Sequence, residues 1–207
     1  MYSAQDFNEA TRQLVSTSHF LYEQGWSPAT SSNYSLRLDA SHIAITVSGK
    51  HKGELTQDDI MVVDLAGNPV NTDKRPSAET LLHTVLYAMF DNVNAVLHTH
   101  SQAATVLSRL HTHDHIIFSD YELQKAFPGV HSHEGELNIP VFANTQDIQA
   151  LARETEHYFK QHPEVPAYFI RGHGLYTWGD SLKDALRHIE AMEFLTACEL
   201  DIKRLTI

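Results

Sequence analysis

The sequence predicts an α/β fold, a three-layer α/β/α domain with a mixed, mostly antiparallel central sheet. Three observations support this class. Short apolar runs of strand length alternate with longer segments that repeat apolar residues at helical spacing. Several strand-like runs follow one another across short turns, as antiparallel neighbours do. No Pro/Gly/Ser-rich linker, low-complexity tract or internal repeat interrupts the chain, so we expect a single domain over residues 1–207.

Helical periodicity and capping residues predict six helices. Ser3 is a plausible N-cap of the first, because apolar residues then recur at helical spacing. Pro76 and Ser77 open the second helix. Thr145 and Ser181 are the expected N-caps of the last two. In chain order, the predicted helices cover residues 3–24, 76–90, a segment that ends near 110, a short helix over 120–127, 145–161 and 181–205.

Short apolar runs bounded by turn residues predict eight strands. The last two flank a glycine-containing turn at 171–174, which makes them a strand pair. In chain order, the predicted strands cover residues 34–38, 43–47, 60–64, 95–98, 116–118, 141–143, 167–170 and 175–178.

The composition is that of an acidic globular protein. The formal net charge of -11 argues against nucleic acid or an anionic membrane as a partner, although a local pocket can still be positive. The single cysteine, Cys198, excludes an intramolecular disulfide and a cysteine-rich zinc site, which suits a reducing compartment. The sequence shows no signal-peptide pattern and no apolar run of bilayer-spanning length. We therefore expect a cytoplasmic protein with neither a membrane nor a nucleic-acid partner.

Two apolar strands are followed by histidines that can share one metal ion. His98 and His100 end the apolar run that starts at residue 95, and residues two apart in a strand face the same side of a sheet. His173 lies in a glycine-flanked turn after another apolar run and can close the set. Three imidazoles leave a divalent ion with open positions, which is typical of a catalytic site. The pattern predicts a metalloenzyme, and the metal stays open because imidazole binds several ions.

Other histidines repeat this spacing, so spacing alone does not select the ligands. His111, His113 and His115 alternate in a polar stretch. His131 and His133 lie among glycine and serine residues. Both settings are typical of loops, and we interpret these five histidines as a solvent-facing, pH-sensitive surface. A second metal site or a mobile lid is the alternative interpretation.

Three motifs together resemble those of a known family. The motifs are Pro76-Ser77-Ala78-Glu79 followed by His83, His98-Thr99-His100-Ser101, and His173-Gly174-Leu175. They resemble the class II aldolase/adducin-head family, and the likeness extends from Gly25 to the last helix. Within the family, three further runs are most similar to its dehydratase branch in methionine salvage. These runs are Tyr22-Glu23-Gln24-Gly25-Trp26, Tyr121-Glu122-Leu123-Gln124-Lys125 and Tyr176-Thr177-Trp178-Gly179.

The resemblance implies roles for five residues. His98, His100 and His173 match the zinc ligands of the family, which implies one Zn²⁺ per subunit. Glu79 matches a carboxylate that can touch the metal and act in acid/base chemistry, whereas without the resemblance it is a carboxylate near a helix N-terminus. Glu122 matches the catalytic acid/base of the dehydratases, whereas the residue pattern alone makes it an exposed glutamate on a short helix.

Three polar loops match the phosphate pocket of the family. The matching residues are Ser31 and Asn33 in the first loop, Ser48, Gly49 and Lys50 in the second, and Ser77 in the third. Hydroxyls, backbone N–H groups and a cation are the usual means of holding phosphate. Two positions depart from the family pattern, because Ser32 replaces a common glycine and Ala78 replaces a serine. Lys50 is either a charge partner of the phosphate or a solvated loop lysine.

The resemblance implies a small phosphorylated sugar as substrate. The expected reaction is zinc-dependent dehydration of 5-methylthioribulose 1-phosphate to 2,3-diketo-5-methylthiopentyl 1-phosphate, with Glu122 moving the proton. A class II sugar-phosphate aldolase or epimerase is the first alternative, because it shares the enediolate chemistry. The predicted last helix ends near Leu205 and Ile207 follows closely, so we expect no tail like the one that aldolases place over a neighbour's site. A non-catalytic assembly module similar to an adducin head is the second alternative. The resemblance also implies a homotetramer.

Overall fold

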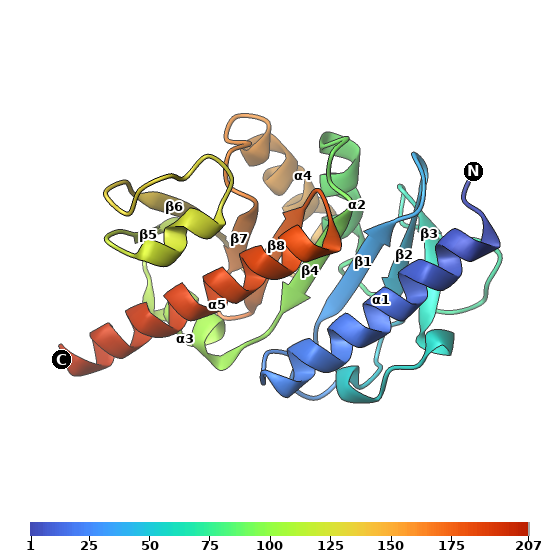
Figure 1. Cartoon of the computed structure of the whole chain (residues 1–207), viewed down its shortest axis with the longest axis horizontal. Helices are drawn as coiled ribbons and strands as arrows, with labels where there is room; N and C mark the ends of the chain where they lie inside the picture. Colours follow the sequence, from blue (N-terminus) through green and yellow to red (C-terminus); the bar gives the residue numbers. More distant parts are fainter. Residues whose placement is uncertain (207) are drawn as a thin grey trace.

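Eight strands form one sheet in the computed structural model, which describes residues 1–206 (Figure 1). Their order across the sheet is β3-β2-β1-β4-β8-β7-β6-β5. Every neighbouring pair is antiparallel except β6 and β7, which confirms the mixed, mostly antiparallel sheet. The strands are β1 (Asn33–Arg37), β2 (His42–Thr46), β3 (Ile60–Asp64), β4 (Ala95–Thr99), β5 (His115–Phe118), β6 (Leu137–Phe142), β7 (Ala167–Ile170) and β8 (Gly174–Gly179).

Helices cover both faces of the sheet, so the predicted three-layer arrangement is confirmed (Figure 1). On one face lie α1 (Ala4–Glu23), α3 (Gln102–Leu110) and α5 (Leu182–Leu205), with the short 3-10 helix η3 (Glu122–Ala126) against α5. On the other face α2 (Thr80–Met89) packs against α4 (Ile148–Phe159). Two further 3-10 helices, η1 (Lys52–Glu54) and η2 (Gln57–Asp59), connect β2 to β3. Each face has its own hydrophobic cluster, because the helices bury apolar stripes against the strands.

The alternation of side chains along β4 decides where its last residues point. Leu97 belongs to the cluster under α1 and α5, and Val96 belongs to the cluster under α2 and α4. His98 continues the second face and stacks on Tyr176 of β8, with ring centroids 3.9 Å apart. Thr99 continues the first face toward α5. His98 is therefore fully buried near the end of β4.

Two of the predicted helix starts are wrong. Pro76 forms an isolated antiparallel bridge, and a turn closed by the 3.1 Å bond from the Thr80 N–H to the Ser77 carbonyl precedes α2. For α4 the N-cap is Asp147, not Thr145, because the Asp147 carboxylate accepts a backbone N–H of the first turn at 2.9 Å. In both places several capping residue types lie close together, and local bonding selects among them.

Other element boundaries differ by a few residues. β6 starts at Leu137 rather than near residue 141, because its first residues pair with β5 before it meets β7. α5 ends at Leu205, as predicted, whereas Ile207 lies outside the described residues. Within residues 1–206, no helix is both long enough and apolar enough to cross a membrane.

Candidate metal centre

Three histidines and a glutamate converge where β4 ends and where the turn between β7 and β8 passes. One side-chain donor atom from each of Glu79, His98, His100 and His173 lies within 4.8 Å of the others. Glu79 Oε1 is 3.0 Å from His173 Nε2, and Glu79 Oε2 is 3.3 Å from His98 Nε2. The imidazole ring of His100 has its centroid 4.5 Å from each of the other two rings. The structure therefore brings together the three histidines that the sequence singled out, and places Glu79 with them.

The orientation of His98 fits a metal ligand. Its Nδ1–H donates to the Leu175 carbonyl at 3.0 Å, which leaves Nε2 with a lone pair directed at the cluster. Nε2 is buried and has no hydrogen-bond partner. Glu79 Oε2, 3.3 Å from this nitrogen, is also an acceptor when ionised. Two buried acceptors that face each other fit a cation held between them.

The protonation states agree with this donor set. Burial lowers the pKa of His98 to about 3 and also lowers the pKa of His100, so both imidazoles are neutral near pH 7. Burial alone would raise the pKa of Glu79, but His98 and His173 outweigh it and hold that pKa below its ordinary value. Neutral imidazoles and an ionised carboxylate are the forms that bind divalent metals, Zn²⁺ among them. The residues present therefore fit a metal ion.

Three members of the cluster, Glu79, His100 and His173, line a cavity of about 330 Å³. This size lies within the usual range for small-molecule sites. The predicted phosphate-pocket residues that line the cavity are Ser31, Asn33, Ser48, Gly49 and Ser77. Thr145 and Gln146 line it as well, although the sequence offered no signal for them beyond their loop position. One cavity thus joins the candidate metal ligands to the polar loops.

The lysine that reaches the cavity is Lys52, which the sequence analysis did not identify. Lys50 does not line the cavity; its side chain is 51% exposed, and its Nζ pairs with Asp59 at 2.9 Å. Lys50 thus fits the second interpretation given above, a solvated loop lysine. Lys52 is 1% exposed, and its Nζ donates to the Lys50 carbonyl at 2.8 Å. Burial lowers the pKa of Lys52 to about 8. In the sequence, the only signal for Lys52 was its position two residues after Lys50.

Asn33 connects the polar loops to Glu79. Its Nδ2 donates to Glu79 Oε2 at 2.9 Å and to Ser77 Oγ at 3.3 Å. Ser77 Oγ in turn accepts the Glu79 backbone N–H at 3.2 Å. Glu79 occupies the N-cap position of α2, but its side chain makes no capping hydrogen bond, and its carboxylate lies against the histidines instead. Ser32, which precedes Asn33, has a φ of 71°, the left-handed region in which glycine is favoured.

Glu122 lies on η3 and does not line this cavity. Its side chain is 72% exposed and pairs with Lys125, and His133 Nδ1 lies 3.7 Å from its Oε2. The hydrogen bond with Lys125 holds the pKa of Glu122 below its ordinary value. Within one copy of the chain, the structure therefore does not place Glu122 with the metal cluster.

The other histidines singled out by spacing lie apart from the metal cluster. Three of them, His113, His131 and His133, are exposed, in keeping with a solvent-facing surface. His115 lies in β5, where its ring bonds to the Tyr158 hydroxyl at 3.0 Å. Among the described residues, only Glu79 and the three cluster histidines form a group of this kind.

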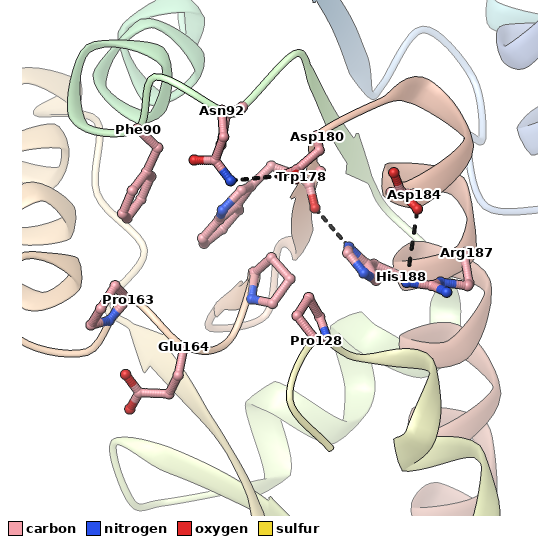
Figure 2. Close-up of a pocket in the computed structure, with 13 residues that line it drawn as sticks. Phe90, Asn92, Pro128, Pro163, Glu164, Trp178, Asp180, Asp184, Arg187 and His188 are labelled. Atoms are coloured by element: carbon pink, nitrogen blue, oxygen red, sulfur yellow. Dashed lines mark hydrogen bonds and ion pairs between the residues drawn. The ribbon is translucent and has the colours of Figure 1, made fainter. Parts of the chain in front are cut away.

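A second cavity lies at the opposite end of β8 (Figure 2). Phe90 and Trp178 form apolar walls together with prolines. Two hydrogen bonds link polar groups here: Asn92 Nδ2 donates to Asp180 Oδ1 at 2.7 Å, and His188 Nδ1–H donates to the Trp178 carbonyl at 2.7 Å. His188 Nε2 is buried without a hydrogen-bond partner, but among the described residues the metal-ligating side chains gather only at the other cavity, so we assign the chemistry to the cavity beside the histidines.

Several curated relatives are similar to this chain over almost its whole length. A methylthioribulose-1-phosphate dehydratase of Marinobacter nauticus is 60% identical over 205 residues, 99% of each chain. One of Hahella chejuensis is 57% identical over 206 residues, again 99% of each. One of Pseudomonas aeruginosa is 56% identical over 198 residues, 96% of this chain and 97% of the relative.

Solved structures support the fold. An L-fuculose 1-phosphate aldolase superposes with a TM-score of 0.80 at 23% identity, covering 99% of this chain and 89% of that one. L-fuculose-1-phosphate aldolase from Thermus thermophilus superposes with a TM-score of 0.72 at 26% identity, covering 96% and 95%. The profile of the Class II Aldolase and Adducin N-terminal domain matches residues 12–200. The chain therefore belongs to the class II aldolase and adducin N-terminal domain family.

Proposed function

We propose that this enzyme is a hydro-lyase of methionine salvage that dehydrates 5-methylthioribulose 1-phosphate to 2,3-diketo-5-methylthiopentyl 1-phosphate. The observation that carries this proposal is the 56–60% identity to dehydratases of that name over nearly the whole chain. The superposed aldolases share only 23–26% identity, so they support the fold and not a second activity. The cavity, which combines a metal-binding cluster with phosphate-type loops, is consistent with a small phosphorylated sugar.

The reaction requires a proton to leave C3 and a hydroxide to leave C4. The C3–H is acidified by the neighbouring C2 carbonyl, but not enough for a side-chain base without further stabilisation of the enolate. Proton removal first gives an enolate with a C2–C3 double bond. As the C2 carbonyl re-forms, these electrons make the C3–C4 double bond, the C4–O bond breaks, and the hydroxide takes a proton to leave as water. The resulting enol then ketonises to the 2,3-diketone.

We assign the metal site to His98, His100 and His173, with Glu79 beside them. A bound zinc ion would supply Lewis-acid chemistry at the substrate's C2 oxygen, which stabilises the enolate. Glu79 would orient substrate or water, because Asn33 and the histidines hold its carboxylate in the wall of the cavity. One ion per subunit matches the one cluster found in the described residues.

The phosphate would bind at the loop end of the cavity. Ser31, Ser48 and Ser77 offer hydroxyls, and Gly49 offers a backbone N–H in a tight turn. Asn33 lies between this end and the metal cluster. The positive charge comes from Lys52, which replaces Lys50 in this role because only Lys52 lines the cavity.

We further propose that Glu122 is the acid/base of this reaction and acts on the cavity of a neighbouring copy in a cytoplasmic homotetramer. In its own copy Glu122 is exposed and does not line the cavity. Leu123 beside it is 40% exposed, which suits a surface covered by another subunit. From there the carboxylate would take the C3 proton and return it to the departing C4 hydroxyl.

The test is an assay with 5-methylthioribulose 1-phosphate beside fuculose 1-phosphate, rhamnulose 1-phosphate and ribulose 5-phosphate. We expect diketone formation from the first substrate only, with bound metal measured on the same sample. Aldol cleavage without dehydration would overturn the proposed function. A metal-replete sample with no activity on any of the four would also overturn it.

A further inference from the structure

A chain of buried hydrogen bonds runs from the core of the α2 layer to Glu79. The Tyr87 hydroxyl lies 2.9 Å from Ser35 Oγ, which lies 2.7 Å from His83 Nδ1. His83 Nε2 contacts Asn33 Oδ1, and Asn33 Nδ2 reaches Glu79 Oε2 at 2.9 Å. The first four residues are 5% exposed or less. The chain therefore links the helix layer to the cavity without passing through solvent.

The residues come from two elements that meet at the sheet. His83 and Tyr87 are one helical turn apart on α2, so they share a face. Asn33 and Ser35 are two residues apart on β1, so they share the sheet face beneath α2. Asn33 lies directly opposite His98 in the register of β1 and β4. The polar chain thus ends beside the metal cluster because of this register.

The direction of every bond in the chain follows from the charge at its end. An ionised Glu79 can only accept, so Asn33 must turn its NH₂ group toward it. Asn33 Oδ1 then faces His83 Nε2, which must carry the proton. The His83 Nδ1 lone pair must accept from Ser35, and Ser35 Oγ accepts from the Tyr87 hydroxyl. Reversing any one bond would place two donors or two acceptors against each other in the core.

We propose that His83 is a positioning residue whose Nε2–H tautomer fixes the Asn33 amide and, through it, the Glu79 carboxylate. His83 does not line the cavity and is fully buried, so it acts without contacting substrate. If Nε2 carried no proton, the Asn33 amide would turn over and present its oxygen to Glu79. The carboxylate would then be repelled from the place where it meets His173 and His98.

Two properties of His83 support this role. Burial lowers the pKa of His83 to about 3, so the ring is neutral and holds a single N–H. Partners on both nitrogens select which nitrogen carries it. An ordinary packing residue would need neither partner. The side chain stacks edge-on against Tyr176, the residue that also packs on His98, so the ring has little freedom to turn.

A matched pair of variants separates positioning from packing. His83→Gln places an amide NH₂ near the position of Nε2 and can still donate to Asn33, whereas His83→Asn is too short to do so. We expect His83→Asn to lower kcat and zinc affinity by about 10–100-fold, the usual effect of losing a residue that orients a metal site. His83→Gln should restore most of both. KM should change little, because His83 does not touch the cavity.

The tautomer can be observed without any activity. Long-range ¹H–¹⁵N spectra of the metal-free, wild-type chain should show His83 protonated at Nε2 and unprotonated at Nδ1. The kcat part of the inference rests on the proposed dehydratase function, but the spectrum and the zinc titration do not. An Nδ1–H tautomer would overturn the inference even if neither variant folds. Equal losses in His83→Gln and His83→Asn, at matched unfolding temperatures, would also overturn it and leave the proposed function intact.

Discussion

Lys52 shows how burial can tune a single residue for anion binding. With its pKa lowered to about 8, Lys52 is charged at neutral pH and loses its proton above about pH 8. We therefore expect KM for the phosphorylated substrate to rise above that pH. Lys52→Met should raise KM about 10–100-fold, the effect of losing one charged hydrogen bond, and should flatten this pH dependence.

Lys50→Met is the matched control for Lys52, because Lys50 is two residues away and points outside the cavity. Its KM should stay close to that of the wild type. The measurement is KM against pH for all three proteins. If the control raised KM as much as Lys52→Met, or if the wild-type profile were flat through pH 8, Lys52 would not be the phosphate partner.

Glu193 lies behind the strand end that holds His98 and His100. It is 2% exposed; its Oε1 accepts the Thr99 hydroxyl at 2.7 Å, and its Oε2 has no hydrogen-bond partner. Burial raises the pKa of Glu193 to about 7, above the ordinary 4.5. The folded state therefore holds this proton more tightly than the unfolded state does. As pH rises from about 4.5 to 7, the free energy of unfolding should fall, by an amount on the order of 3 kcal/mol.

Glu193→Gln tests this linkage because it keeps the neutral shape and cannot ionise. Urea unfolding of the metal-free chain at about pH 5 and about pH 8 should show the fall for the wild type and a smaller one for the variant. At the higher pH the variant should be the more stable protein. The same pH dependence in both proteins would mean that Glu193 does not carry the buried proton.

At the scale of elements, the approach of β8 to β4 determines the geometry of the metal cluster. A Cβ added at Gly174 would lie 2.0 Å from the Thr99 carbonyl oxygen and 3.1 Å from His98 Cε1. Gly174→Ala must therefore push the two strands apart at the site. We expect a loss of about 1–3 kcal/mol in stability, typical of overpacking, and at least about 10-fold in zinc affinity. Gly135→Ala is the control, since nothing lies within 4 Å of a Cβ there. Zinc titration against a chelating dye would measure the affinity of both variants, and equal affinities would contradict this account.

The sequence predicted which helices and strands form more accurately than it predicted where they begin and end. Apolar runs placed all eight strands because most of them are buried on both faces, which leaves a continuous apolar signal. The starts of α2 and α4 were misplaced because Ser77 and Thr145 are suitable caps that make other local bonds instead. That difference matters at α2, where the later start leaves Glu79 free to face the histidines.

At the scale of the whole molecule, contacts between residues far apart in the sequence determine which parts of the site could not be predicted. The three histidines were predictable because each lies at or just after the end of an apolar strand, where loops gather ligands over the sheet. The chain through His83 was not, because Ser35 and His83 are 48 residues apart and pair only after β1 and α2 pack together. Lys52 was missed for a local reason, since its direction depends on the turn into η1.

In the assembled protein, the proposal to test is that Glu122 acts in the cavity of a neighbouring subunit. If Glu122 serves a neighbour's cavity, inactive Glu122→Ala and His100→Ala chains should complement each other when they are mixed, unfolded and refolded together. In a random ring of equal parts, about a quarter of the sites would join an intact metal cluster to an intact Glu122. Activity should rise toward that fraction of the wild-type rate, while each variant refolded alone stays inactive and Glu122→Ala keeps its metal. If the mixture stays inactive although the subunits exchange, Glu122 does not act across the interface.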